Sequence, residues 1–230
     1  MPPEKVDIDA LAEALTEPFV MQRVAEVHHF AVYLYLCTGV VARHRHSMQD
    51  ELFYVHSGAL TLDTDWGEAT LRRHEFAVVP QGVAHSSGSL ARTIVLLFQA
   101  QGDPERRNGR GRFGAEGEPG RLQRWSALAG GNEEDRPREP LALASADGMS
   151  LRIVRPREDT PWHSHAGHDE LLYLIEGELG IGSEQGPLAL RAGEMTVISR
   201  GRIHRLTASG PSVAVSFIHR KVRPEEQLGQ

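Results

Sequence analysis

Short apolar runs recur along this chain, and polar residues, glycines and prolines separate them at close spacing. In the first half the runs occupy residues 30–37, 51–56, 59–63, 69–72, 76–79 and 92–99. In the second half they occupy residues 141–145, 150–155, 171–175, 178–181, 188–191, 195–198 and 212–219. Apolar runs of this length are typical of strands. Many short strands with hardly any helix predict an all-β fold built from small sandwiches or barrels.

One short helix is expected before the first strand. Residues 9–16 have helical spacing, with leucines and alanines on one side and Asp9 in the N-cap position. Pro18 would end this helix, because proline cannot continue the hydrogen-bonded backbone. We predict that residues 1–20 form an N-terminal helical arm that packs on a barrel or on a second subunit. A frayed terminus is the alternative.

The composition changes between residues 101 and 120. This segment is rich in glycine, arginine and glutamate and nearly free of large apolar side chains, as linkers are. Its arginines resemble a nucleic-acid patch, but acidic residues are interspersed and no aromatic platform accompanies them. We therefore interpret residues 101–120 as a solvated linker. The prediction is a first barrel at residues 21–100 and a second at residues 121–230.

The overall composition excludes several classes of function. The net charge of the 230 residues is −6, so no basic excess indicates a nucleic-acid partner. The longest apolar runs have strand length, too short to cross a membrane as a helix. Cys37 is the single cysteine, so no disulfide can form within the chain. Because the N-terminus shows no charged start followed by an apolar run, we expect a cytoplasmic protein without a membrane partner.

A set of residues recurs in the second half at a constant offset of 119 positions. The offset relates His44 to His163, His46 to His165, Glu51 to Glu170, His85 to His204, Tyr54 to Tyr173, Gly58 to Gly177, Gly82 to Gly201 and Phe98 to Phe217. No insertion separates these landmarks. Such agreement indicates that the two halves are copies of one β unit.

Each copy holds three histidines and one glutamate with the spacing of a metal site. On a strand, His44 and His46 would share a face, because successive side chains alternate between the two faces. Glu51 would begin the next strand, and His85 would follow the bend at Pro80-x-Gly82. We predict two metal sites, formed by His44, His46, Glu51 and His85 and by His163, His165, Glu170 and His204.

Three neutral imidazoles and one carboxylate suit a divalent transition metal, namely Fe, Mn, Ni, Co, Cu or Zn, rather than calcium. On an octahedral ion, four protein ligands leave two neighbouring positions open for water, dioxygen or a substrate. On tetrahedral zinc the same ligands would close the site. We expect up to one metal per barrel, and Glu51 or Glu170 could also detach and act as a catalytic base.

The remaining histidines carry a weaker signal. His56 and His74 have no histidine counterparts in the second half, so we interpret them as surface residues. His168 precedes Glu170 in the predicted ligand loop and is assigned to the rim of the site. Phe53 shares the parity of Glu51 along its strand, which indicates an apolar pocket, although core packing explains it equally well.

The two motifs resemble those of the cupin superfamily. The first cupin motif runs from a glycine through His-x-His and a glutamate to a second glycine; here it spans residues 39–58 and, without the leading glycine, residues 161–177. The second motif contains Pro-x-Gly-x2-His; Ser199 replaces its proline in the second copy, and His74 replaces its leading glycine in the first. The resemblance implies an antiparallel jelly-roll barrel in each half, and hence a two-domain cupin with a metal near the mouth of each barrel.

Cupins host many reactions, so the fold alone does not fix the function. Our leading hypothesis is a metal-dependent enzyme that acts on a small metal-chelating metabolite, as a dioxygenase-type oxidoreductase. A metal-dependent isomerase or decarboxylase that does not use oxygen is one alternative, and a non-catalytic binding or sensor module is another. We expect a homodimer. The first half is slightly favoured as the catalyst because Pro80 stiffens its turn.

Overall fold

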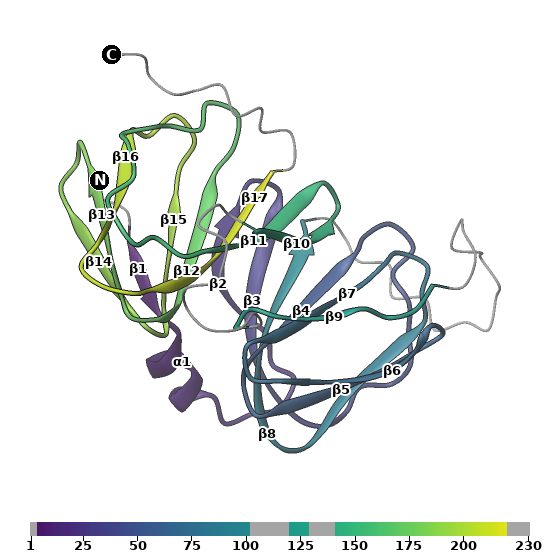
Figure 1. The fold of residues 1–230 in the computed structure, drawn as a ribbon. Coiled ribbons are helices and arrows are strands. Elements are labelled where there is room, and N and C mark those ends of the chain that lie inside the picture. The colour runs from purple at the N-terminus through teal and green to yellow at the C-terminus, as the bar shows by residue number, and fades with distance from the viewer. Residues whose placement is uncertain (1–3, 102–119, 129–140, 220–230) are drawn as a thin grey trace. The chain divides into compact units, whose positions relative to one another are not determined.

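The computed structural model describes residues 4–101, 120–128 and 141–219, and it divides into two compact units (Figure 1). The first unit comprises residues 12–127, and the second comprises residues 1–11 with residues 128–230. The division follows the two copies of the repeat with one exception. The first eleven residues belong with the second copy.

Antiparallel strands build the first unit. They are β2 (Gln22–Val27), β3 (Phe30–Val40), β4 (Glu51–Ser57), β5 (Ala59–Thr64), β6 (Gly67–Arg72), β7 (Glu75–Val79), β8 (His85–Ala100) and β9 (Arg124–Ser126). Among the described residues the sheet order is β2-β3-β8-β4-β7-β9, and β5 pairs with β6 and with β8. In Figure 1 the long β8 runs past β5 and then between β3 and β4.

The length of β8 ties the metal-site segments to the core of the sheet. Its first four residues pair with β5, and residues 94–99 pair with β4. Its inward side chains join those of β3, β4, β5 and β7 in one core cluster. The fully buried members include Cys37, Val55, Leu60, Leu62, Leu71 and Val95. Burial of this apolar surface is what holds the unit together.

The second unit repeats this arrangement. Its strands are β1 (Lys5–Asp7), β10 (Leu141–Ala146), β11 (Met149–Val154), β12 (Glu170–Glu176), β13 (Glu178–Ser183), β14 (Leu188–Arg191), β15 (Glu194–Ile198), β16 (His204–Ala208) and β17 (Val213–His219). Within the described residues they form a six-stranded sheet, β1-β15-β12-β17-β11-β10, and a three-stranded sheet, β14-β13-β16. Leucine and isoleucine from both sheets fill the core between them.

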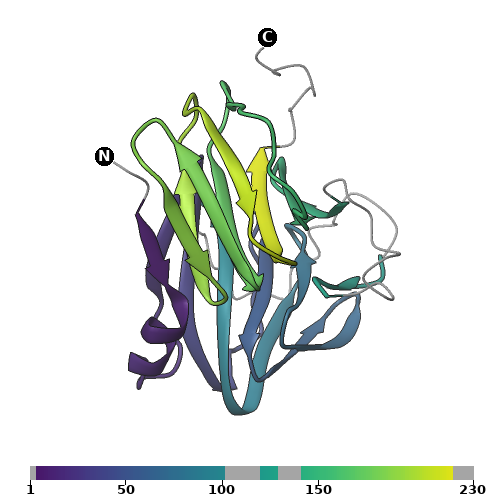
Figure 2. The ribbon, with the colours of Figure 1, turned by 60° about the vertical axis from the view of Figure 1, so that its left-hand side comes forward.

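The N-terminal segment adds a strand to the second unit. Lys5–Asp7 pairs antiparallel with residues 194–196 of β15, and Figure 2 shows this purple strand at the edge of the unit. Helix α1 (Ile8–Ala14) follows at once. The backbone N–H of Ala10 donates to Asp7 Oδ1 at 2.8 Å, so Asp7 is the N-cap. The prediction that Asp9 caps the helix was therefore wrong by two residues.

Helix α1 has seven residues, whereas a helix needs about 20 apolar residues to cross a bilayer. None of the helices in the described parts of the chain is long and apolar enough for that role.

The predicted all-β fold is confirmed, and so is the jelly-roll character of the two copies. Four strands were not among the predicted runs: β1, β2, β9 and β16, which have three, six, three and five residues. Because β9 pairs with β7, the first unit extends to residue 127, beyond the predicted end at residue 100. Nearly all of the predicted linker, residues 102–119, lies outside the described residues.

The repeated glycine Gly58 occupies a turn that no other residue fits. Its φ is +85°, in the left-handed region that L-residues avoid. A Cβ at this position would lie 2.7 Å from the backbone oxygen of Arg92, which cannot move away without breaking β8. Gly177 has a φ of +82° and the backbone of Pro211 and Ser212 at the same place. Two separate requirements, conformation and close approach, therefore coincide at this glycine.

We expect Gly58→Ala to lower the free energy of unfolding by about 3 kcal/mol or more, because it adds a backbone clash to the strain of a positive φ. Gly67→Ala is the matched control: its φ is +109° and nothing lies within 4 Å of the added Cβ. It should cost only about 1 kcal/mol. Urea unfolding of both variants measures the difference, and equal losses would show that the close approach to β8 is unimportant.

Candidate metal centres

The His-x-His segment of the first unit lies between strands, not on one. His44 and His46 belong to the connection from β3 to β4, so the prediction of a strand here was wrong. His44 instead forms a single antiparallel bridge with His85. Its N–H donates to the carbonyl of His85 at 2.9 Å, and the N–H of His85 donates back at 2.8 Å. The bridge involves only these two residues. The imidazole rings of His44 and His85 are both buried.

A tight turn secures the second histidine of the segment. Gly82 has a φ of +79°, and its N–H donates to the carbonyl of His46 at 2.6 Å. The N–H of Gln81 in the same turn donates to Asp50 Oδ1 at 2.9 Å. The turn that precedes His85 is thereby connected to the loop that carries His46. The predicted role of the Pro80-x-Gly82 bend, to position the strand end, is consistent with these bonds.

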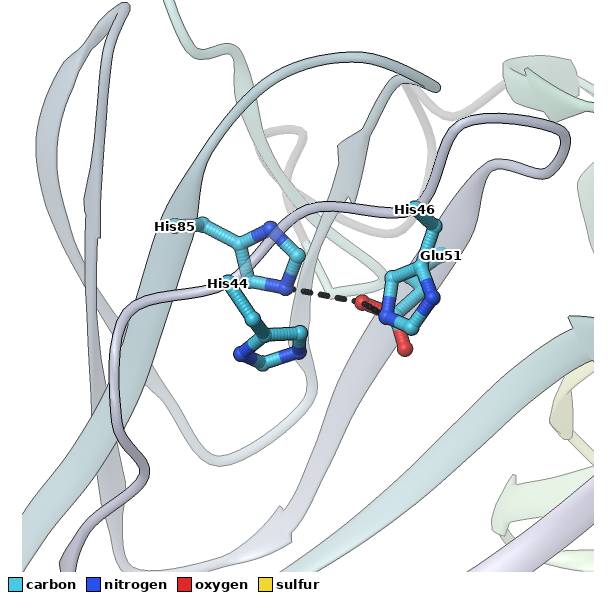
Figure 3. Close-up of side chains that lie close together, drawn as sticks. All are labelled: His44, His46, Glu51 and His85. Atoms are coloured by element: carbon cyan, nitrogen blue, oxygen red, sulfur yellow. Dashed lines mark ion pairs between the residues drawn. The ribbon is translucent and has the colours of Figure 1, made fainter. Parts of the chain in front are cut away.

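The four predicted ligands converge in the first unit (Figure 3). Glu51 is the first residue of β4, as the sequence predicted. His85 is the first residue of β8, which begins seven residues before the strand predicted at residues 92–99. His85 Nε2 lies 2.8 Å from Glu51 Oε2, and His46 Nε2 lies 3.1 Å from the same oxygen. The four ligand atoms all lie within 4.8 Å of one another. All four side chains are buried, none more than 8% exposed.

Backbone carbonyls set the tautomer of two of these rings. His44 Nδ1 lies 2.8 Å from the carbonyl oxygen of Ala42, and His85 Nδ1 lies 3.1 Å from that of Val83. A carbonyl can only accept, so each Nδ1 carries the proton and each Nε2 keeps its lone pair. This is the arrangement that metal-binding histidines use.

The inward-facing atoms of the cluster have no satisfactory partner. Nε2 of His46, Nε2 of His85 and Oε2 of Glu51 are buried, and none has hydrogen-bond geometry with another described group. A buried polar atom without a partner costs about 1–3 kcal/mol. Burial raises the pKa of Glu51, but the two neighbouring imidazoles lower it further, so the carboxylate is ionised. Lone pairs and a negative charge directed at one point fit a divalent cation.

The second unit repeats the cluster with His163, His165, Glu170 and His204. His163 and His204 form the corresponding bridge. Glu170 Oε2 lies 3.1 Å from Nε2 of His165 and 3.5 Å from Nε2 of His204. This cluster is less enclosed, because His163 and His165 are only half-buried.

The turn of the second unit makes the same hydrogen bonds although it lacks the proline. The N–H of Gly201 donates to the carbonyl of His165 at 2.8 Å, and Asp169 Oδ1 accepts from the N–H of Arg200 at 2.9 Å. The carbonyl of Ser199 accepts from the N–H of Arg202 at 3.2 Å. Ser199 therefore supports the same turn as Pro80, and the predicted difference in stiffness stays a prediction.

A neutral donor holds the outer oxygen of each glutamate, and the sequence analysis missed both donors. In the first unit the amide of Gln99 donates to Glu51 Oε1 from the paired position on β8. In the second unit the hydroxyl of Ser216 donates to Glu170 Oε1 at 2.7 Å. The two donors do not correspond under the 119-residue offset, so the repeat could not reveal them. The alternation along β8 and β17 places both residues on the inner face, which was the available signal.

Three histidines outside the clusters differ from their predicted places. His56 and His74, predicted at the surface, are 4% and 8% exposed. His74 has a φ of +63° where the second copy has Gly193, and its Nδ1 lies 2.8 Å from the hydroxyl of Tyr54, which offsets the strain. His168, predicted at the rim, is buried 4.6 Å from the ring of His165. Burial lowers the pKa of His168 to about 4.

A cavity of about 240 Å³ reaches the first cluster. His44 and Glu51 of the cluster are among its lining residues. Its apolar wall includes Phe19, Phe53 and Leu97. The predicted pocket-facing position of Phe53 is thus confirmed. The cavity offers a small molecule access to the place where the four ligand atoms converge.

A family model for the cupin domain matches residues 38–94 and 150–219, which is more than half of the chain and covers both clusters. The chain belongs to the cupin family. A relative in Bacillus subtilis (strain 168), the uncharacterized protein YdbB, is 33% identical over 91 residues, which is 39% of this chain and 80% of the relative.

Several solved structures share the fold over nearly the whole chain. A cupin 2 conserved barrel domain protein from Leptotrichia buccalis has a TM-score of 0.70 at 11% identity, covering 94% of this chain and 95% of its own. Salicylate 1,2-dioxygenase from Pseudaminobacter salicylatoxidans has a TM-score of 0.71 at 12% identity, covering 94% and 84%. Ylba from Escherichia coli has a TM-score of 0.66 at 12% identity, covering 95% and 91%. At these identities the likeness shows the fold.

We expect Gln99→Leu to weaken metal binding in the first unit by about tenfold to a hundredfold, because Glu51 loses the bond that orients it. Ser216→Ala should do the same in the second unit only. Each variant is therefore the control for the other. Isothermal titration of the metal-free chain with Mn(II) resolves the two sites. Equal weakening of both sites by either variant would contradict the assignment of these donors.

Proposed function

We propose that the first cluster of this cupin binds a divalent transition metal and acts with it as a dioxygenase-type oxidoreductase on a small metal-chelating metabolite. One observation carries this proposal. A buried set of three imidazoles and one carboxylate, with inward lone pairs that nothing else satisfies, stands at the end of a cavity large enough for a small organic molecule. Closed structural metal sites have no need of such a cavity.

Iron(II) or manganese(II) suits the donor set, and when bound it would supply Lewis acidity and positions for oxygen and a chelating substrate. His44, His46 and His85 would hold the metal through Nε2, and the backbone bonds at Nδ1 keep two of these rings in that tautomer. Glu51 would hold it through Oε2 while Gln99 occupies Oε1.

The protein side chains would also handle a proton of the substrate. A hydroxyl or enol must lose its proton to chelate a metal, and Glu51 is an ionised carboxylate beside the cavity. We propose that Glu51 accepts that proton, which gives it a catalytic as well as a ligating role. Glu170 would serve in the same way if the second cluster is also active.

The solved relatives support this reading in one respect. Salicylate 1,2-dioxygenase, also solved in complex with gentisate as a variant, shows that this fold can house a dioxygenase. The low identity means that its substrate is not transferred to this chain.

The proposal is tested by loading the chain with iron(II) or manganese(II) without oxygen and then measuring oxygen uptake over a panel of catechols and hydroxy acids. We expect at least one compound to be consumed together with oxygen. Glu51→Gln should lower kcat by about a hundredfold or more, because both the ligand charge and the base are lost. Glu26→Gln, at an exposed position in the same unit, should leave the rate unchanged.

Three results would contradict the proposal, each in favour of a different reading. Stoichiometric four-coordinate zinc in both clusters would indicate structural sites. Turnover that proceeds equally well without oxygen would indicate an isomerase or decarboxylase. Tight binding of metal and small molecule with no turnover of any panel member would indicate a binding or sensor module.

A further inference from the structure

The cavity of the first unit contains a pair of buried hydroxyl groups that the metal cluster does not use. Tyr35 on β3 is 2% exposed and Ser87 on β8 is 4% exposed, and both line the cavity. The two hydroxyls are hydrogen-bonded to each other, and burial raises the pKa of Tyr35 well above its ordinary value. Tyr35 is therefore a neutral hydroxyl that can exchange one more hydrogen bond with a molecule in the cavity.

The second unit shows that the fold does not require this pair. The 119-residue offset places Val154 where the first unit has Tyr35 and Leu206 where it has Ser87. Both residues pack with the apolar core cluster of the second unit. Because the same strands pack with two hydrocarbon side chains at these positions, two buried hydroxyls in the first unit need a reason other than packing.

The charge of the cavity restricts what it can hold. No lysine or arginine is among its lining residues, and Glu51 contributes a negative charge. A phosphate or dicarboxylate would bring two negative charges beside that carboxylate with only the metal to compensate them. Most of the other lining residues are apolar, and the ring centroid of Phe19 lies 6.5 Å from that of Tyr35. These features favour a molecule with an apolar body and one polar end.

The size of the cavity restricts the ligand further. A volume of about 240 Å³ corresponds to roughly eight water molecules at the volume that each occupies in the liquid. That is enough for one aromatic ring with small substituents.

We propose that the first unit binds a single-ring, largely apolar molecule with its oxygen-bearing end at the metal cluster, and that Tyr35, paired with Ser87, recognises an oxygen of that end. This inference rests on the proposed function for the presence of a metal, but not for any turnover. Tyr35 is thus a specificity-determining residue of the first unit, and the second unit lacks its counterpart.

The test uses 4-nitrocatechol, a single-ring chelator whose visible spectrum changes when it binds a metal. The full chain is loaded with nickel(II), which does not oxidise the probe, and the dissociation constant is measured by absorbance. We expect Tyr35→Phe to raise this constant about threefold to tenfold, which is the loss of one hydrogen bond.

Tyr54→Phe is the matched control. Tyr54 is 1% exposed in the same unit, but its hydroxyl bonds His74 and it does not line the cavity. It should reduce the melting temperature without changing the dissociation constant. Equal binding by Tyr35→Phe and the parent, or equal weakening by both variants, would overturn the proposal. If Tyr35→Phe does not fold, Ser87→Ala is measured instead, and unchanged binding by it would have the same meaning.

Competition tests the charge argument. Unsubstituted catechol should displace the probe more readily than phosphoglycolate does, and equal displacement would overturn the proposed ligand class. These results are separable from the oxygen assay. If probe binding depends on Tyr35 but no compound is turned over, this inference stands and the enzyme proposal is contradicted. If a compound is turned over and Tyr35→Phe does not affect that turnover, the enzyme proposal stands and this inference is contradicted.

Discussion

The backbone bridge between the His-x-His segment and the third histidine is the contact on which both clusters depend. His44 and His85 exchange two backbone hydrogen bonds, and His163 and His204 do the same in the second unit. Neither His-x-His segment lies on a strand, so the position of each segment depends on hydrogen bonds such as these. The bridge attaches a loop to the first residue of a strand, and the glycine turn that donates to the next histidine carbonyl completes the attachment. The glutamate needs no such device because it begins a strand of the main sheet.

The clusters also link the stability of the fold to a ligand. In the first unit Nε2 of His46, Nε2 of His85 and Oε2 of Glu51 are buried without an adequate partner among the described residues, and in the second unit Nε2 of His204 is. Groups of this kind destabilise a folded chain unless something binds them. The hydrophobic cores of the two units offset that cost; buried leucine and valine side chains dominate the first core, and leucine and isoleucine dominate the second. A cation bound at the centre of a cluster would interact with these groups and thereby stabilise the folded chain.

The two units share the frame of the site and differ in what surrounds it. Gln99 holds the glutamate in one and Ser216 holds it in the other. The first cluster is enclosed and adjoins a cavity with two hydroxyl groups, whereas the second has half-buried histidines and a buried His168 beside one of them. Duplicated sites that keep identical ligands but different surroundings would bind the same metal and different molecules. The preference for the first unit that Pro80 suggested from the sequence now has a separate basis in the cavity.

The sequence by itself determined the repeat, the all-β fold and the membership of both clusters. The type and spacing of the ligand residues can be read directly from the sequence, and each ligand recurs 119 positions later. The sequence also predicted that Glu51 begins its strand. The tertiary structure alone decided the features that depend on partners distant in the chain. The donors Gln99 and Ser216 follow from strand register, the burial of His56 and His74 from packing, and the place of Lys5–Asp7 from its pairing with β15. The cavity, too, was decided by the tertiary structure. The space between side chains depends on how whole strands pack and is not a property of any one residue.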